Sequence, residues 1–141
     1  MTPSDMAPSG MTIVASRYAS DETAERVVAA VAAHGMTVMA RIDHAAAAAK
    51  VGLALRPTQV LIFGAPQAGT LLMQAAQTTG IDLPLKILVW RDQSGHCWIG
   101  YNEPHWIVQR HGAAIGGDAV IGAMTQTLAA LAAEAGERAT S

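Results

Sequence analysis

The adjacent residues Asp43 and His44 are the first candidates for acid–base chemistry in this chain. A neutral imidazole titrates near physiological pH, and a carboxylate that orients the ring would make it a general base. The same pair also fits a structural role, because aspartate is a preferred N-cap and His44 would then be a first-turn residue of a helix. The N-cap preference favours the structural interpretation.

Lys86 is the second candidate, because it interrupts the otherwise apolar segment 85–91. A lysine buried in a sheet can have a lowered pKa and act as a nucleophile. More often its stem lies along the sheet while the ammonium group reaches solvent or a carboxylate, since a buried unpaired charge is costly. Both interpretations place Lys86 close to the large ring residues of the same region.

Trp90 and Trp98 flank a predicted turn, so they are expected to face each other across a hairpin. Such a pair could line a pocket or simply pack. Polar groups that converge among apolar strands favour a small binding pocket. We expect its lining to be Lys86, Trp90, Trp98 and Tyr101, with His44 near the mouth.

The segment 64–70, Gly-Ala-Pro-Gln-Ala-Gly-Thr, has the glycine spacing of a phosphate-binding loop. That mechanism needs a lysine after the second glycine, and the residue there is Thr70. The N-terminus of the following helix could still attract an anion through its free N–H groups. A plain structural turn is the favoured interpretation.

The remaining histidines and the one cysteine, Cys97, do not form a recognisable metal motif. A closed zinc site needs four ligands with characteristic spacing, and neither C-x-x-C nor H-x-x-x-H occurs. His105 and His111 are six residues apart, which places them on different faces of a helix, and strand alternation separates His96 from Cys97. We predict no metal and no cofactor, and a buried, inert thiol at Cys97.

The elements that would position these residues are indicated by apolar periodicity and by capping residues. Strands are predicted at residues 12–18, 36–43, 60–63, 85–91 and 96–101. Helices are predicted at 20–34, 45–51 and 70–78, between Asn102 and Gly112, and from 116–118 to 136.

Three local features refine these elements. Ser20, Asp43 and Asn102 are the expected N-caps. Strict alternation along 36–43 is expected to place Met36, Val38, Ala40 and Ile42 on one face. The apolar stripe of the last helix could dock on its own sheet or on a partner chain; it comprises Ile121, Met124, Leu128, Leu131 and Ala135.

The order β-α-β-(α)-β-α-β-β-α-α does not alternate throughout, and short turns join neighbouring strands. It predicts an α+β fold, a mostly antiparallel sheet with helices packed on one face, in which segment 85–91 is central. We expect a disordered leader at 1–11, a single domain at 12–136 and a frayed tail at 137–141.

Six segments in order resemble the domain-of-unknown-function family 302. They are 42–49, 53–58, 60–66, 69–73, 83–90 and 101–104. The resemblance implies a compact α+β fold that often pairs as a dimer, and it implies no established reaction. One departure is visible, because the family usually carries Gly-Asn-Pro where this chain has Gly64-Ala65-Pro66, and the Ala65 side chain can hold neither a turn nor a ligand.

Composition narrows the class of protein further. The 141 residues are 51% hydrophobic and 14% charged, with a net charge of −2, and no Lys/Arg run marks a nucleic-acid binder. One cysteine excludes a stapled secreted fold, the N-terminus lacks signal-peptide character, and no apolar stretch approaches the roughly 20 residues of a membrane span. We expect a cytoplasmic protein with no nucleic-acid or membrane partner. Weak charge repulsion favours a homodimer.

The leading hypothesis is therefore a small-ligand-binding or sensing module that acts as a homodimer. Two alternatives stay open: an enzyme that uses His44 or Lys86 as acid or base, and a ligand-free oligomerisation module. No recognisable catalytic set is present, so we expect a protein that is not an enzyme.

Overall fold

β4 (Leu85–Arg91), the strand with apolar residues on both faces, lies in the middle of a five-stranded antiparallel sheet. The computed structural model describes residues 7–112 and 118–137. The strand order is β1-β5-β4-β3-β2, where the other strands are β1 (Met11–Ser16), β2 (Thr37–Asp43), β3 (Thr58–Gly64) and β5 (Cys97–Asn102). The predicted central place of the strand that carries Lys86 is confirmed.

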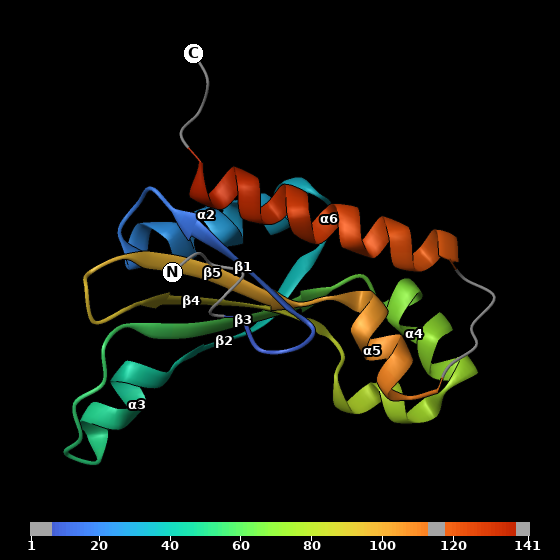
Figure 1. Cartoon of the computed structure of the whole chain (residues 1–141), viewed down its shortest axis with the longest axis horizontal. Coiled ribbons are helices and arrows are strands. Elements are labelled where there is room, and N and C mark those ends of the chain that lie inside the picture. The colour runs from blue at the N-terminus through green and yellow to red at the C-terminus, as the bar shows by residue number, and fades with distance from the viewer. Residues whose placement is uncertain (1–6, 113–117, 138–141) are drawn as a thin grey trace.

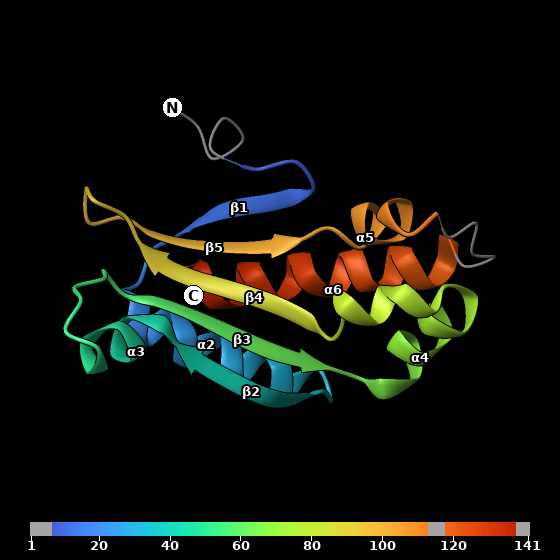
Figure 2. The ribbon, with the colours of Figure 1, turned by 90° about the horizontal axis from the view of Figure 1, so that it is seen from below.

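Two long helices, α2 (Ser20–Ala33) and α6 (Asp118–Gly136), cover one face of this sheet (Figure 1). The shorter helices lie toward the ends of the sheet and comprise α3 (His44–Lys50), α4 (Pro66–Ala75), the 3-10 helix η1 (Gln77–Ile81) and α5 (Pro104–Arg110). Figure 2 shows the opposite face of the sheet, with α2 and α6 behind the strands. The predicted α+β fold and its element order are confirmed.

The core lies between the sheet and these two helices. Leu61, Ile87 and Ile99 point into it from three neighbouring strands, and all three are fully buried. Val27 of α2 and Leu128 of α6 meet them from above and are buried as completely. Each such side chain stabilises the fold by about 1.5–3 kcal/mol, so the apolar stripe of the last helix docks on its own sheet.

Helix α6 is long and apolar enough over Ala119–Gly136 to cross a membrane by composition alone. Its packing is nevertheless that of a core helix, because Leu128, Leu131 and Ala135 are fully buried. Gly136 approaches the sheet so closely that an added Cβ would lie 3.0 Å from Ile99 Cδ1 and 3.2 Å from the carbonyl oxygen of Ala15.

The prediction of a single face for β2 was wrong, because the strand contains a register shift. Val38 pairs with Phe63, but the next pair is Ala40 with Ile62, so one residue is inserted between them. A bulge of this kind reverses the direction of the side chains that follow. Val38 therefore packs against the core, whereas Ile42 lies on the other face with 41% of its surface exposed.

Several helix starts differ from the prediction. α4 begins at Pro66 rather than Thr70, since proline is suited to the first turn of a helix. The N-caps of α2 and α5 are Ala19 and Glu103, so Ser20 and Asn102 do not cap these helices. The predicted cap of α3 is confirmed, because Asp43 Oδ1 accepts a hydrogen bond from the Ala46 N–H at 2.9 Å.

Candidate functional site

A cavity of about 600 Å³ lies at one end of the sheet. It lies where β3 ends and β4 begins, between the first turns of α4 and the first half of α6. Four segments distant in sequence build it, at 34–39, 64–73, 83–85 and 120–127. We call it the methionine-lined pocket.

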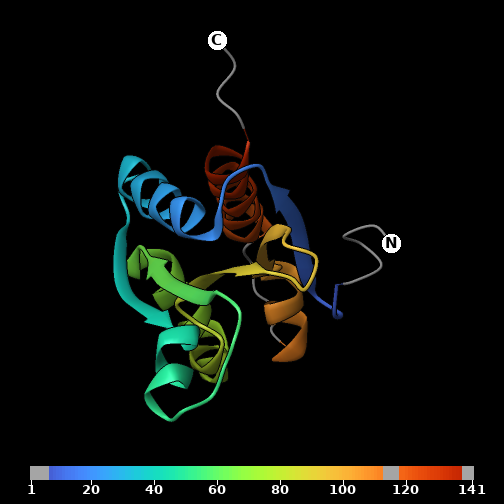
Figure 3. The ribbon, with the colours of Figure 1, turned by 90° about the vertical axis from the view of Figure 1, so that its left-hand side faces the viewer.

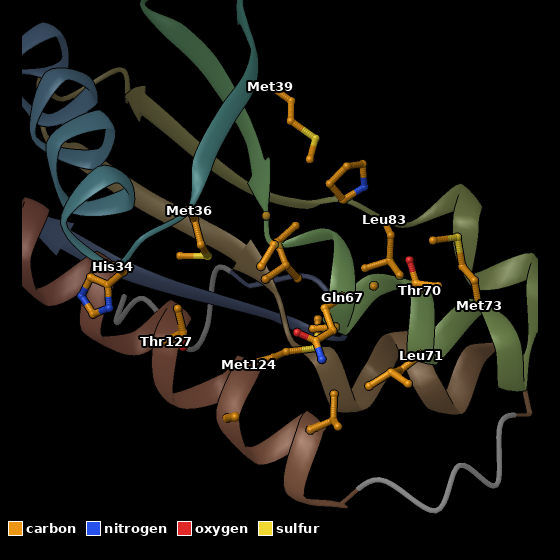
Figure 4. A pocket seen from close by; sticks show the side chains of 18 residues that line it. His34, Met36, Met39, Gln67, Thr70, Leu71, Met73, Leu83, Met124 and Thr127 are labelled. Carbon is orange, nitrogen blue, oxygen red and sulfur yellow. The ribbon is translucent and has the colours of Figure 1, made fainter.

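Methionine dominates the walls of this pocket. Met36 and Met124 lie on one side of it and Met73 on the other, while Met39 stands at the upper end in the view of Figure 4. Four of the seven methionines of the chain therefore surround one cavity. Unbranched thioether side chains adapt their shape to a ligand, so the lining is apolar and adjustable.

Few polar side chains border the methionine-lined pocket. Gln67 and Thr70 come from α4, and Thr127 comes from α6. The ring of His34 stands at one end, where its Nε2 lies 2.9 Å from Glu134 Oε2. Such a set can orient an apolar molecule through a small number of hydrogen bonds.

The loop with phosphate-loop spacing forms one wall of the same pocket. Gly64 ends β3, Ala65 is the N-cap of α4, and Gly69 and Thr70 lie on the first turns of α4. The chain has Ala65 at the place where the resemblance implies asparagine, so this wall carries a methyl group instead of an amide. The prediction of a plain turn was wrong for most of this segment, because residues 66–70 belong to α4, and the segment also borders a cavity.

Lys86 lies on the face of β4 that α2 and α6 leave uncovered, and it is partly buried. Its Nζ donates hydrogen bonds to the carbonyl oxygens of Asp82 and Pro84, both at 3.0 Å. Burial lowers the pKa of Lys86, and the negative charge of Asp82 opposes that shift. Two backbone carbonyls hold the ammonium group at the start of the strand.

The ring residues of the predicted pocket are divided between the two faces of the sheet. Trp90 pairs directly with Trp98, as expected from the hairpin. Tyr101 lies on the helix-covered face, where it is 7% exposed and burial raises its pKa. The set does not surround one cavity, because Tyr101 is separated from both tryptophans by the sheet itself.

His44 is exposed at the start of α3, beyond the end of the edge strand β2. Its neighbour Asp43 pairs with Gln59, close to the end of β4 that carries Trp90, whereas Lys86 lies at the other end. The structure therefore separates His44 from Lys86. That these five residues bind a ligand stays a prediction, but none of them lines the methionine-lined pocket.

Cys97 is buried, and its Sγ lies 3.5 Å from Thr23 Oγ1. Burial raises the pKa of the thiol, which keeps it protonated and unreactive at neutral pH. His96, the next residue, is exposed. Within residues 7–112 and 118–137, no three His, Cys, Asp or Glu side chains are grouped to hold a metal ion.

The methionines of the pocket are the functional candidates that motif reasoning missed. They belong to no motif and come from three distant segments of the chain. Met36 lies just before β2 and Met39 within it, Met73 lies on α4 and Met124 lies on α6. The available signal was compositional, since methionine is frequent in this chain whereas phenylalanine occurs once. Met39 is the residue inserted at the β-bulge, between Val38 and Ala40.

Comparison with known proteins places most of the chain in one family. Residues 12–131 match the family described as "Domain of unknown function DUF302". A crystal structure of an uncharacterized conserved DUF302 protein from Bacillus stearothermophilus superimposes with a TM-score of 0.79, covering 91% of this chain and 99% of that one. The two sequences are 21% identical, so this likeness concerns the fold.

Curated relatives are more similar in sequence but longer. A protein of Brucella suis biovar 1 named fluoride-specific ion channel FluC 1 is 47% identical over 116 residues, which is 82% of this chain and 46% of that protein. A protein of the same name from Brucella abortus biovar 1 is also 47% identical and is covered over 43% of its length. The chain thus spans less than half of these relatives.

Proposed function

This chain belongs to the DUF302 family, whose description assigns no function, and from that premise we propose that it binds a small apolar molecule in the methionine-lined pocket. The observation that carries the proposal is the pocket itself. Its volume of about 600 Å³ falls within the range of about 300–1,000 Å³ that holds cofactors and drug-sized ligands. The ligand is taken up by shape and dispersion, and the few polar side chains orient it.

The side chains that line the pocket suit a flexible ligand, or several ligands of different shape, better than a single rigid one. Leu71 is 45% exposed and Met39 is 51% exposed although both border the cavity. Exposed apolar side chains at a cavity gain burial when a ligand covers them, by roughly 25 cal/mol per Å². Met73 and Met124 can change rotamer to follow the shape of the ligand.

The acid–base alternative receives less support from the geometry. His44 and Lys86 lie toward opposite ends of the sheet, and neither borders the methionine-lined pocket. Lys86 donates to two backbone carbonyls, so its ammonium group is already satisfied. A binding role needs no proton transfer and is consistent with a pocket whose polar groups are few.

Homodimerisation through the uncovered face of the sheet is the second part of the proposal. Ile42, Val60, Ile62, Leu88 and Trp90 share this face and are each at least partly exposed. Neighbouring pairs in the register place them side by side, so the patch is continuous across three strands. A contiguous apolar patch of this kind marks an interaction surface, and a second copy of the chain offers the same patch in a two-fold arrangement.

The names of the curated relatives suggest a second candidate function, that of an accessory domain joined to a fluoride channel. The 47% identity supports a shared role for the matched region, and the remaining length of those proteins supports a separate channel part. Fluoride is strongly hydrated, and an apolar pocket offers it little compensation for lost water. On this candidate the domain senses another molecule and does not itself hold fluoride.

A titration with the neutral, solvent-sensitive dye Nile red tests the pocket. We expect saturable fluorescence enhancement with the wild-type protein, and binding at least about tenfold weaker for Ala123→Phe, which fills the cavity with a ring. Ala129→Phe is the matched control, since Ala129 is an exposed alanine of the same helix outside the pocket. The intrinsic tryptophans are poor reporters because none of them lines the pocket.

Equal dye binding by the Ala123→Phe and Ala129→Phe proteins would contradict the assignment of the pocket. A parallel thermal-denaturation series with sodium fluoride and sodium chloride at equal ionic strength tests whether the domain itself holds fluoride, and both candidate functions predict no difference between the two salts. Stabilisation by fluoride alone would favour an ion site over an apolar-ligand site.

A further inference from the structure

A second cavity, of about 420 Å³, lies at the opposite end of the sheet from the methionine-lined pocket. It is bordered by the β1–α2 connection and by the β4–β5 hairpin, which face the viewer in Figure 3. Leu85 lines the first cavity and Arg91 lines the second, and these residues begin and end β4. A strand of that length separates the two cavities by about 20 Å. We call the second one the arginine cavity.

Two arginines give the arginine cavity its positive charge. Arg17 follows β1, and Arg91 ends β4, so their side chains approach from two different elements. Within the described part of the chain, neither guanidinium forms an ion pair, whereas those of Arg41 and Arg110 do. A guanidinium presents a fork of N–H donors that matches the oxygens of a phosphate or carboxylate.

The N-terminus of α2 also borders the arginine cavity, through Ala19 and Ser20. The first hydrogen bond of this 14-residue helix joins the Thr23 N–H to the Ala19 carbonyl at 2.8 Å. The N–H groups of residues 20–22 therefore have no partner within the helix. Such N–H groups and the helix dipole both favour an anion.

Ser20 provides an observation independent of the helix dipole. This residue lines the cavity and is only 8% exposed. Its hydroxyl makes no hydrogen bond to any of the described residues, whereas the neighbouring hydroxyls of Ser16 and Thr23 bond to each other at 2.7 Å. Among the described residues, no fully buried side-chain oxygen lacks a partner, so the Ser20 hydroxyl reaches the cavity, where a ligand can bond to it.

The acidic residues nearby leave this donor set available. Asp21 and Glu22 are exposed on the first turn of α2 and do not line the cavity. The Asp92 carboxylate accepts hydrogen bonds from Trp98 Nε1 at 2.8 Å and from the N–H groups of Ser94 and His96 at 2.9 Å. It is thereby committed to the hairpin turn.

We propose that the arginine cavity binds the phosphate group of a small phosphorylated molecule. Arg17 and Arg91 neutralise the charge, and the Ser20 hydroxyl and the free N–H groups of α2 orient the oxygens. The cavity exceeds the size of one phosphate, so it leaves room for the organic part of a phosphate monoester. This site is separate from the methionine-lined pocket and does not depend on it.

The test is a ¹H–¹⁵N NMR titration of the full chain with inorganic phosphate at constant ionic strength. We expect saturable shifts of the Ser20, Asp21 and Glu22 amides. Arg17→Gln and Arg91→Gln should each weaken binding by about tenfold, the usual value of one charge-assisted contact. Arg56→Gln removes the same charge from an exposed loop outside the cavity and should leave the affinity unchanged.

A second titration with ribose 5-phosphate identifies the source of the phosphate, because tighter binding than inorganic phosphate means that the ester is the ligand. The same spectra show whether each variant is folded. If one of the two arginine variants fails to fold, the other still tests the proposal. Absence of saturable shifts at these amides with roughly 10 mM phosphate would overturn the proposal. An equal loss of affinity in the Arg56→Gln protein would overturn it as well.

Discussion

The Asp82 carboxylate joins two parts of the chain through a short network of charged hydrogen bonds. Its Oδ2 lies 2.6 Å from His111 Nε2, and both of its oxygens accept from Arg110 Nη1 at 2.8 and 2.9 Å. His111 Nδ1 in turn lies 2.8 Å from the hydroxyl of Thr78. The end of α5 is thereby tied to the segment that leads into β4.

The pKa of Asp82 follows from these contacts. Burial raises the pKa of this carboxyl, but the hydrogen bonds from His111 and Arg110 and their charges outweigh burial and hold it below its ordinary value of 3.8. A lowered folded-state pKa stabilises the fold at every pH above 3.8. The stabilisation is lost as the pH falls from 3.8 through the folded-state pKa.

Asp82→Asn should therefore lower the free energy of unfolding at pH 7 by about 1–3 kcal/mol, because it leaves the buried His111 ring and the half-exposed Arg110 guanidinium with a weaker partner. Urea denaturation at pH 7 and at successively lower pH measures this. The gap between wild type and variant should shrink below pH 3.8. Glu22→Gln, at an exposed carboxylate without an ion pair, should change stability by less than about 0.5 kcal/mol at either pH. A gap that stays constant down to acid pH would contradict the role of Asp82.

Sequence reasoning considered His111 as a metal ligand and did not find this network. The partner of His111 lies 29 residues earlier in the chain, and only the packing of α5 beside η1 brings the two together. By contrast, the pairing of Trp90 with Trp98 was predictable, because a short hairpin fixes the register locally. Contacts between residues could be predicted where a single turn determines them. They could not be predicted where they depend on the packing of distant segments.

Among the elements, α3 depends most on its cap. It has seven residues and none of them is buried, so little tertiary packing stabilises it. The hydrogen bond from the Ala46 N–H to Asp43 Oδ1 satisfies one of its free donors. Short helices without packing are marginal in water, so the cap contributes a large share of the stability of α3.

Asp43→Ala should loosen α3 without unfolding the rest of the protein. Loss of an N-cap costs about 1 kcal/mol, which corresponds to roughly fivefold faster amide hydrogen exchange in residues 46–50. Asp21→Ala is the control, because Asp21 lies on the first turn of α2 without a capping hydrogen bond, and α2 is held by its buried face. Unchanged exchange in α3 would show that the Asp43 cap does not stabilise it.

The order and type of the elements were predictable from periodicity, glycine and proline. Gly35, for example, ends α2 with a φ of +75°, a conformation that glycine adopts without strain. The bulge in β2 was not predictable, since the alternation of Met36, Val38, Ala40 and Ile42 reads equally well as an unbroken strand. The register of β2 against β3 decides it, and that register depends on contacts between distant segments.

At the scale of the molecule, α2 and α6 leave one face of the sheet uncovered, with α3 beside one end of β3 (Figure 2). Ile42 lies on this face with 41% of its surface exposed, among the partly exposed apolar residues of β3 and β4. A homodimer that buries this face would place Ile42 in an environment where a charge is costly.

Ile42→Glu should therefore raise the dissociation constant of the proposed homodimer at least about tenfold. Sedimentation velocity over a range of protein concentrations measures this. Ile81→Glu is the matched control, because Ile81 is 73% exposed on η1 and lies off the sheet. A dimer that persists in the Ile42→Glu protein, or a wild-type protein that is monomeric at all concentrations, would contradict this interface.

The candidate site was less predictable than the fold. Sequence reasoning chose the centre of the sheet, where Lys86 and the tryptophans lie, because polar and aromatic residues attract attention in an apolar strand. The methionine-lined pocket instead forms where the sheet ends and α4 and α6 diverge, which no local pattern describes. Its lining became recognisable only when four separate segments were brought together.

The two halves of helix α6 have different surroundings. Beyond Leu128 its small residues press it onto the sheet, and Gly136 leaves no room for a side chain. Before Leu128 the helix stands away from the strands, and Val120, Ala123 and Thr127 face the hollow beneath it. Substitutions at Val120, Ala123 and Thr127 would thus change the shape of the cavity, while Leu128, Leu131 and Ala135 hold the rest of the helix on the sheet.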